Sequence, residues 1–170
     1  MWQGRWITAY RQGNWEYAAR TGSIKAAVIL ALTEGDVLLV EQYRVPLRRR
    51  SIELPAGLIG DDAGGEDDDP YTAARRELLE ETGYRARQWQ NLGEYYSSPG
   101  MVSEGFTLLK ATELTKVGAG GGVDGEDITV HRVPLAGIAG TITAFREAGL
   151  AIDTRMLMLL GPAFIANTRP

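Results

Sequence analysis

Three glutamates, Glu77, Glu80 and Glu81, lie close together in a segment rich in helix-forming residues. On an α-helix, which turns by about 100° per residue, their side chains would share one face. Like charges at this spacing each cost an exposed helix about 0.2–0.5 kcal/mol, so helix stability alone does not account for them. Carboxylate oxygens suit Mg²⁺ or Mn²⁺, and a divalent cation would turn the repulsion into attraction. An ordinary solvent-facing acidic surface is the alternative interpretation.

The helix that would carry these glutamates has a signal at each end. Asp69 can cap the first turn, and Pro70 suits the first helical position, where a missing N–H group costs nothing. Gly83 lies where a helix would end in a left-handed turn. We therefore expect one helix of about three and a half turns between Asp69 and Gly83. Its apolar stripe would consist of Tyr71, Ala74 and Leu78.

The composition is that of one globular domain. The chain has 170 residues, of which 44% are hydrophobic and 24% charged, and its formal net charge is −4. This charge argues against general nucleic-acid binding, so affinity for polyphosphates would have to come from a few placed cations or from a metal. With no cysteine and His131 as the single histidine, disulfides, thiol nucleophiles and multi-histidine metal sites are excluded. The first residues are unlike a signal peptide and no apolar run could span a membrane, so we expect a cytoplasmic protein.

Strand patterns flank the predicted helix on both sides. Strands are predicted over residues 24–32, 37–44, 51–54, 88–92, 93–96, 106–111 and 127–133. The segments 88–92 and 93–96 can also form one kinked strand. Two helices are expected to close the chain, over residues 135–148 and 153–167. This order predicts a mixed α/β sandwich rather than a regular alternation of strands and helices.

Four connections between these elements carry polar or glycine-rich sequence. Residues 48–50 form a basic loop, for which solvent exposure or anion contact are the two interpretations, and residues 55–57 form a turn. The acidic segment 60–69 is interpreted as a flexible insertion or as a metal-binding loop. The glycine-rich segment 116–125 has no periodicity, and we expect it to be mobile.

Residues 1–24 are distinguished by their aromatic content. They include Trp2, Trp6 and Trp15, and short strands with a hairpin around Gly13 are expected. Such large side chains need a surface to cover them. That surface is either the core of the same chain, or a dimer interface or a nucleotide base, because tryptophan is enriched in both settings.

Residues 76–84, Arg-Glu-Leu-Leu-Glu-Glu-Thr-Gly-Tyr, match the core of the Nudix box, R-E-U-x-E-E-x-G-U with U bulky and apolar, at every specified position. Upstream, Ala56-Gly57 lies where the first glycine of the box belongs. The flanking segments Glu41-Gln42-Tyr43-Arg44 and Glu53-Leu54-Pro55-Ala56-Gly57, together with Pro99, resemble the ADP-ribose and nucleoside-diphosphate-sugar pyrophosphatase branch of Nudix hydrolases. The resemblance covers about residues 25–150. It implies a Nudix-type α/β/α sandwich with a mixed central sheet over residues 25–170, preceded by the β segment 1–24.

The chain departs from the Nudix box at one place. The connection between Gly57 and the helix is longer than the box expects. We interpret the excess as an insertion in which Asp68 or Glu66 replaces the first glutamate of the box. The departure concerns that first acid and leaves the three helix glutamates unaffected.

The resemblance also implies roles for individual residues. Mg²⁺ or Mn²⁺ would be held by Glu77, Glu81, Glu80 and the Ala56 carbonyl. Arg76 would keep the glutamates in place by pairing with Glu80 at i,i+4. A base that orients or deprotonates the attacking water would come from Glu126 or, as second choice, Asp124.

Substrate contacts are expected from several separate segments. Arg44 would contact a phosphate, because its planar fork fits phosphate oxygens. The further substrate contacts predicted are Glu53, Pro99, Gly100, Met101, Glu104 and Trp6.

The implied reaction is metal-dependent hydrolysis of the diphosphate bond of ADP-ribose or a related nucleotide sugar, by a homodimer. Alternatives are a Nudix hydrolase of another nucleoside diphosphate derivative, such as a GDP-sugar or a dinucleoside polyphosphate, and a non-catalytic domain that senses ADP-ribose. Sensor domains of this kind often lack glutamates of the box, and here all three are present.

Overall fold

The computed structural model describes residues 1–60, 69–123 and 125–161. These residues form a three-stranded sheet in the order β1-β2-β3 and an eight-stranded sheet whose main path is β11-β6-β5-β4-β9-β8. In the larger sheet β10 also pairs with β5, and β7 with β4. The pairs β4–β9 and β6–β11 are parallel and the others antiparallel, so the sheet is mixed, as predicted. The strands are β1 Trp2–Gln3, β2 Ile7–Gln12, β3 Trp15–Arg20, β4 Ala26–Thr33, β5 Asp36–Arg44, β6 Arg49–Glu53, β7 Ala56–Leu58, β8 Tyr84–Tyr96, β9 Gly105–Lys116, β10 Thr129–Pro134 and β11 Ala151–Ile152.

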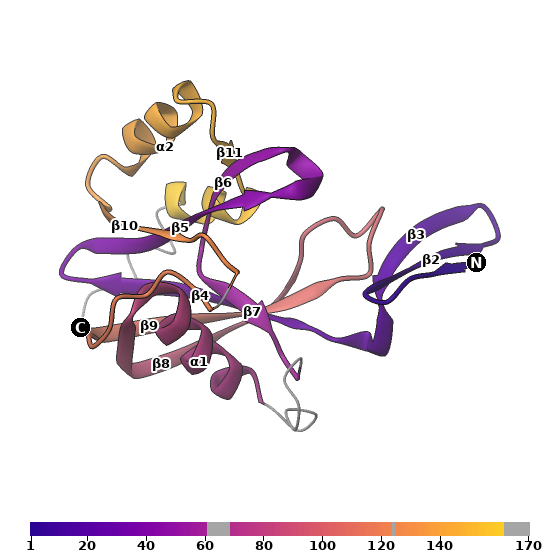
Figure 1. Ribbon diagram of the computed structural model, residues 1–170, viewed down its shortest axis with the longest axis horizontal. Coiled ribbons are helices and arrows are strands. Elements are labelled where there is room, and N and C mark those ends of the chain that lie inside the picture. Colours follow the sequence, from indigo (N-terminus) through magenta and orange to yellow (C-terminus); the bar gives the residue numbers. More distant parts are fainter. Residues whose placement is uncertain (61–68, 124, 162–170) are drawn as a thin grey trace.

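Helices cover both faces of the larger sheet (Figure 1). Helix α1 (Pro70–Thr82) lies on one face, while α2 (Ile138–Glu147) and the 3₁₀ helix η3 (Thr154–Leu160) lie on the other. Two further 3₁₀ turns, η1 (Thr21–Ser23) and η2 (Val45–Leu47), connect strands. The α/β/α sandwich with a mixed central sheet that was expected from the sequence is confirmed.

The central strand β4 shows why both faces are covered. Its residues alternate between two cores: Val28, Leu30 and Leu32 pack on the α2 and η3 side. Ala27 and Ile29 pack instead against the apolar stripe of α1. All five side chains are buried, because successive side chains of a strand point to opposite faces. A strand buried on both faces reads as the continuous apolar run seen in the sequence.

The local signals of α1 act as predicted. The Asp69 carboxylate accepts hydrogen bonds from the backbone N–H groups of Tyr71 (2.7 Å) and Thr72 (2.9 Å), which caps the helix. Gly83 ends it with a φ of 74°, the left-handed conformation that glycine adopts without strain. Helix α1 therefore spans the predicted residues, and its position on the sheet is set by the buried Ala73, Ala74 and Leu78.

Four predicted elements differ in the structure. Residues 49–50 belong to strand β6 and not to a loop, because they pair with β5. Residues 56–58 form strand β7 rather than only a turn, because they pair with β4. The segments 88–92 and 93–96 form one strand, β8, with a bulge between Asn91 and Gly93, which agrees with the second predicted alternative; the difference is that β8 already begins at Tyr84.

The fourth difference is at the end of the described chain. The final helix is a 3₁₀ helix that ends at Leu160, seven residues before its predicted end. Gly161 is extended and precedes a proline in the sequence, a position that disfavours helix. The remainder of the predicted helix, 162–167, lies outside the described residues, as do Glu66 and Asp68 of the acidic insertion.

The aromatic segment 1–24 forms the predicted hairpin, β2 and β3, which stands apart from the α/β/α core (Figure 1). Backbone hydrogen bonds join it to the loop between β8 and β9: Ala18 N–H donates to the Met101 carbonyl, and Ser103 N–H to the Ala18 carbonyl, both at 3.0 Å. Trp2, Trp6 and Trp15 remain more than half exposed. The chain's own core therefore does not cover them.

Candidate active site

A cavity of about 660 Å³ opens on the larger sheet, where α1, β5, β6, β7, β9 and the β8–β9 loop meet, and Arg20 of β3 lines its rim. This volume is within the range of small-molecule sites. Its wall is strongly charged: among the described residues that line it are three arginines and six carboxylates, an excess of three negative charges when all are ionised. These charged residues are Arg20, Arg44, Arg155, Glu53, Glu77, Glu81, Glu104, Glu126 and Asp153.

Each arginine of the cavity wall is matched by a carboxylate. Arg44 donates two hydrogen bonds to Glu53, from Nε to Oε1 at 2.8 Å and from Nη2 to Oε2 at 2.7 Å. Arg155 binds Asp153 in the same forked manner, at 2.8 Å and 2.7 Å, and its Nη2 also lies 3.4 Å from Glu53 Oε2. Burial alone would raise the pKa of Asp153, but its bonds to Arg155 outweigh burial and lower it.

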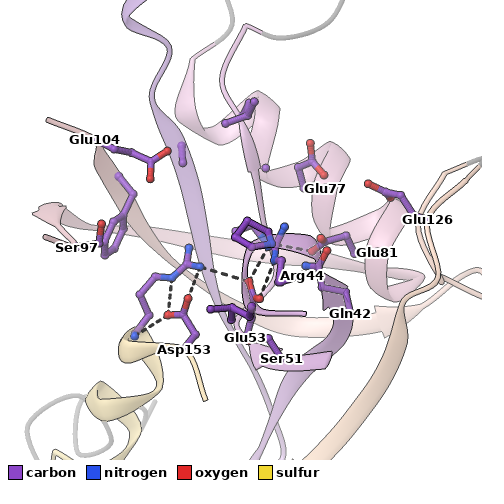
Figure 2. Close-up of a pocket in the computed structure, with 18 of the residues that line it drawn as sticks. Gln42, Arg44, Ser51, Glu53, Glu77, Glu81, Ser97, Glu104, Glu126 and Asp153 are labelled. Carbon is purple, nitrogen blue, oxygen red and sulfur yellow. Dashed lines mark hydrogen bonds and ion pairs between the residues drawn. The ribbon is translucent and has the colours of Figure 1, made fainter. Parts of the chain in front are cut away.

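The third pair joins the two sheets. Arg20, the last residue of β3, forms an ion pair with Glu104 directly before β9. The three arginine pairs balance three of the six carboxylates. The remaining acids, Glu77, Glu81 and Glu126, lie together at the opposite side of the cavity from Glu104 and Ser97 (Figure 2).

Helix α1 presents Glu77 and Glu81 to the cavity, one helical turn apart. Glu77 rests against strand β7 at Gly57, where a Cβ atom would come within 2.0 Å of the Glu77 carboxyl carbon. The glycine is therefore required by the close approach of this carboxylate rather than by backbone conformation. Glu81 accepts a hydrogen bond from the Ala56 N–H group at 3.0 Å. Strand β7 thus holds both glutamates in place.

Burial of these acids changes their ionisation. Burial raises the pKa of Glu77 to about 7, against the effect of Arg76 and with a further contribution from the charges of Glu80 and Glu126. Burial raises the pKa of Glu81 to about 8, and the Ala56 N–H group opposes this while Glu77 and Glu126 add to it. Each acid is held close to other negative charges in a poorly hydrated place. A cation placed among them would lower both pKa values and favour the ionised forms.

The donor set fits a hard divalent cation in kind, because carboxylate oxygens are what Mg²⁺ and Mn²⁺ prefer. The carboxylates nevertheless are not gathered into a ready-made coordination sphere: in the described part of the chain no three acidic or imidazole side chains are grouped so as to hold an ion. Glu81 is turned to the Ala56 N–H group, and Glu126 to the Val123 N–H group at 3.0 Å. Glu81 would have to turn away from the Ala56 N–H group to share an ion with Glu77.

The loop that carries Glu126 is attached to helix α1. Gly121 N–H donates to the Glu81 carbonyl at 2.8 Å, and Gly122 N–H to the Glu80 carbonyl at 3.0 Å. Both glycines have positive φ values. This part of the loop is bonded to the C-terminal end of α1, whose last carbonyls need such donors, and the mobility expected from its glycines stays a prediction.

The structure brings seven of the predicted site residues to the cavity wall: Arg44, Glu53, Ala56, Glu77, Glu81, Glu104 and Glu126. Glu80 is half-buried beside Glu77, whose pKa it raises. Arg76 lies 3.5 Å from Glu77 Oε1 and donates to the Leu58 carbonyl at 3.4 Å. Its pairing with Glu80 stays a prediction. Asp124 lies outside the described residues.

Four other predicted residues do not line this cavity. Pro99 and Gly100 border a second cavity of about 650 Å³, between the β8–β9 loop and the β2–β3 hairpin. Met101 has an exposed side chain, and Trp6 is exposed with the Arg5 guanidinium 4.5 Å from its ring centroid. Their predicted substrate contacts would need a substrate or a second chain to extend beyond the main cavity.

Sequence reasoning missed Arg20, Arg155 and Phe106, all of which line the cavity. The spacing of Asp153 and Arg155 could have predicted their mutual pair, because Asp153 lies at the predicted start of a helix and Arg155 two residues later. Their closeness to Glu53 could not have been predicted, since it depends on the parallel pairing of β11 with β6.

Comparisons with known proteins agree with this geometry. Residues 23–130 match the NUDIX domain. The chain is 38% identical over 109 residues to the methanol dehydrogenase activator of Bacillus methanolicus, covering 64% of this chain and 56% of that protein. It is 38% identical over 91 residues to the ADP-ribose pyrophosphatase of Bacillus subtilis strain 168, covering 53% and 46% of the two chains. It is 33% identical over 144 residues to the GDP-mannose pyrophosphatase of Cronobacter sakazakii, covering 79% and 70%.

A solved structure described as an ADP compounds hydrolase superposes with a TM-score of 0.69 at 20% sequence identity, over 96% of this chain and 94% of that one. At this identity the likeness concerns the fold. Several of the matched relatives, including the first two, are covered over only about half of their length. The match of the NUDIX domain spans more than half of this chain and contains α1 with its glutamates, and the chain therefore belongs to the Nudix family.

Proposed function

We propose that the chain is a Nudix pyrophosphohydrolase that cleaves the diphosphate bond of ADP-ribose or a related nucleoside diphosphate sugar, giving a nucleoside monophosphate and a sugar phosphate. The observation that carries this proposal is the division of the cavity wall into two sides. On one side lie three carboxylates that pair with none of the arginines of the wall, and around the rest lie three arginines, each paired with a carboxylate. A diphosphate fits such a wall because it needs cations at the acidic side and guanidinium donors elsewhere.

The reaction requires one water molecule. Its oxygen attacks one phosphorus, the bond from that phosphorus to the bridging oxygen breaks, and the other phosphate leaves with the bridging oxygen. We assign to Glu126 the role of holding the water and accepting its proton, because this acid faces the cavity beside Glu77 (Figure 2).

Mg²⁺ or Mn²⁺ is the proposed cofactor. Glu77, Glu81 and Glu80, with the Ala56 carbonyl, would hold it, and it would supply charge neutralisation for the phosphates. The support for this assignment is electrostatic: two buried carboxylates with raised pKa values repel each other and would repel a diphosphate. A cation removes both penalties at once.

Arg44 is the proposed phosphate contact. It uses Nε and Nη2 to bind Glu53, so the N–H groups of Nη1 are available to a phosphate. The Glu53 pair would then hold the guanidinium in a fixed orientation rather than neutralise it, because the fork remains partly open to the cavity. Glu104 and the segment 99–101 would lie along the nucleoside or the terminal ribose.

The test is a panel assay with ADP-ribose, GDP-mannose, ADP-glucose, NADH and a nucleoside triphosphate, each with and without Mg²⁺. We expect metal-dependent release of AMP and ribose phosphate from ADP-ribose, with a higher kcat/KM than for any other compound of the panel. Absence of turnover with every compound would contradict the enzyme assignment. Tight binding of ADP-ribose without turnover would instead favour a sensor.

A GDP-sugar is the second candidate substrate. It is favoured by a relative named a GDP-mannose pyrophosphatase, whose match extends over 144 residues and 79% of this chain. The two candidates differ in base and sugar but not in the bond that is cleaved, so the panel separates them by their kcat/KM values.

We also propose that the chain is a homodimer, through the exposed aromatic side chains of the N-terminal sheet. Trp6 would then contact a substrate bound to the partner chain. Sedimentation analysis of the whole chain and of a Trp2→Ala/Trp6→Ala variant tests this: a monomeric wild type would contradict it. Among the described residues no helix is long and apolar enough to cross a membrane. A cytoplasmic location remains a prediction from the sequence.

A further inference from the structure

Arg50 of strand β6 reaches across β5 to the residue that follows Glu126. Its Nη1 donates to Asp127 Oδ2 at 2.7 Å, and its Nη2 lies 3.1 Å from the Asp127 carbonyl oxygen. The same guanidinium binds strand β5 through Nε to Glu41 Oε1 at 2.5 Å and Nη2 to the Glu41 carbonyl at 3.2 Å. One planar group therefore joins the backbone of the Glu126 loop to the backbone of the central sheet.

The register explains how this contact arises. Arg50 pairs with Tyr43 on one edge of β5, while Glu41 pairs with Thr129 on the other edge. Side chains two residues apart on a strand share a face, so Arg50, Glu41 and Thr129 form a row across three strands. Arg50 is long enough to cross this row and reach the chain where it enters β10.

The Glu41 side of the contact is itself held. His131 Nε2 lies 2.9 Å from Glu41 Oε2, and the His131 ring packs edge-on against Phe145 of α2 with ring centroids 5.2 Å apart. Each oxygen of the Glu41 carboxylate therefore has its own partner. The anchor of Arg50 is fixed by two further elements, β10 and α2.

The loop is thus held at both ends with Glu126 between them. Its first part, Gly121 and Gly122, donates hydrogen bonds to the α1 carbonyls, and its last part, Asp127, is bound by Arg50. The Glu126 carboxylate also packs on Gly122, where a Cβ atom would lie 2.4 Å from Oε2. With both ends fixed, the position of this carboxylate relative to α1 is determined by the backbone around it.

We infer that Arg50 is a positioning residue for catalysis: it clamps the Glu126 loop on the central sheet so that Glu126 meets the water beside the α1 glutamates. This inference depends on the proposed function, in which Glu126 acts in the chemical step. The Asp127 side chain is exposed, and ion pairs with exposed partners add little to folding stability, so we assign the importance of the Arg50–Asp127 contact to geometry. A misplacement of about 1 Å at a reacting group can cost on the order of 100-fold in rate.

The test compares Arg50→Ala with Arg49→Ala in steady-state hydrolysis of the best substrate from the panel. Arg49 is the neighbour of Arg50 on the same strand, is exposed and does not line the cavity. Replacing it by Ala removes the same charge as Arg50→Ala and serves as the control. Arg50→Ala should lower kcat by about 10- to 100-fold with little change in KM, because Glu126 acts on the bound substrate. Arg49→Ala should change kcat by no more than about twofold.

Three readouts separate positioning from a merely structural role. Arg50→Lys keeps the charge but cannot span the carbonyls of Glu41 and Asp127, so its kcat should resemble that of Arg50→Ala. Guanidinium added at a non-denaturing concentration should restore part of the kcat of Arg50→Ala. Combined with Glu126→Gln, Arg50→Ala should cost nothing further, because it acts through Glu126.

Asp127→Asn guards against a folding defect in the arginine variants. Its side chain is 85% exposed, and the matched control is Glu34→Gln, an 83% exposed acid paired with Arg132. Asp127→Asn should lower kcat by a smaller factor than Arg50→Ala, and Glu34→Gln should leave it unchanged. Equal kcat values for Arg50→Ala and Arg49→Ala would overturn the inference while leaving the proposed function intact. An inactive wild type would refute the proposed function itself.

Discussion

Replacing Glu81 by Gln should make the metal-free protein more stable at pH 8 while removing its activity. Glu81 is 5% exposed, and burial raises its pKa to about 8 from an ordinary value of 4.5. Gln has nearly the same volume, cannot ionise, and can still accept the hydrogen bond from the Ala56 N–H group. The substitution therefore removes a buried charge without opening a cavity.

The size of the effect follows from the pKa values. Between pH 4.5 and 8 the folded protein keeps a proton on Glu81 that the unfolded chain has lost, so stability falls as the pH rises. For a pKa near 8 the loss is about 1 kcal/mol at pH 5 and about 4 kcal/mol at pH 8. At pH 8 the Gln variant should therefore unfold about 10 °C above the wild type, and at pH 5 the two should differ little.

The measurement is thermal unfolding in EDTA at pH 5 to 8, repeated with Mg²⁺. Mg²⁺ should raise the unfolding temperature of the wild type most at pH 8 and that of Glu81→Gln much less, because bound metal stabilises only the folded state that has the ligand. Turnover of the variant should fall by orders of magnitude. Glu16→Gln, an exposed acid on β3, serves as the control. A metal-free Glu81→Gln variant that is less stable than the wild type at pH 8 would refute the reasoning.

Three further predictions concern the same cavity. Glu126→Gln should lower kcat by about 10²- to 10⁴-fold with KM nearly unchanged, measured by steady-state kinetics, and an unchanged kcat would transfer the role to another group. Gly57→Ala should lower turnover and Mg²⁺ affinity with little change in unfolding temperature, because the added Cβ meets the movable Glu77 side chain. The control is Gly140→Ala on α2, where a Cβ has open space; it should change neither turnover nor Mg²⁺ affinity. Removal of divalent ions with EDTA should abolish hydrolysis, and Mg²⁺ or Mn²⁺ should restore it; activity that persists in EDTA would contradict the metal assignment.

The parts of the fold that the sequence predicted are those with local signals. Helix α1 has an acidic cap, a proline and a terminal glycine within its own residues, and the turn before β5 contains Glu34-Gly35. The parts that the sequence did not predict depend on distant partners. Arg49 and Arg50 read as a basic loop, and they form a strand because β5 offers them an edge to pair with.

The glycines of the segment 116–125 are a second case in which the structure depends on partners distant in the sequence. A run of glycines without periodicity favours a mobile loop when only the sequence is considered. In the structure these glycines lie close to the end of α1: a Cβ atom at Gly120 would lie 2.4 Å from the Thr82 carbonyl carbon, and one at Gly83, which ends α1, would lie 2.3 Å from the Gly118 oxygen. Flexibility and close approach use the same residue, and only the partner distinguishes them.

Helix α1 consequently has two roles in the proposed reaction. Its side chains Glu77 and Glu81 face the cavity, and the carbonyl groups of Glu80 and Glu81 hold the loop that presents Glu126. The proposed metal ligands and the proposed base are therefore attached to one rigid element, so movement of α1 carries both together. Arg50 then fixes the far end of the loop to the sheet on which α1 packs, which leaves Glu126 little freedom to move relative to the glutamates. This arrangement accounts for how a base can be carried on a glycine-rich loop and still be placed accurately enough for the chemical step.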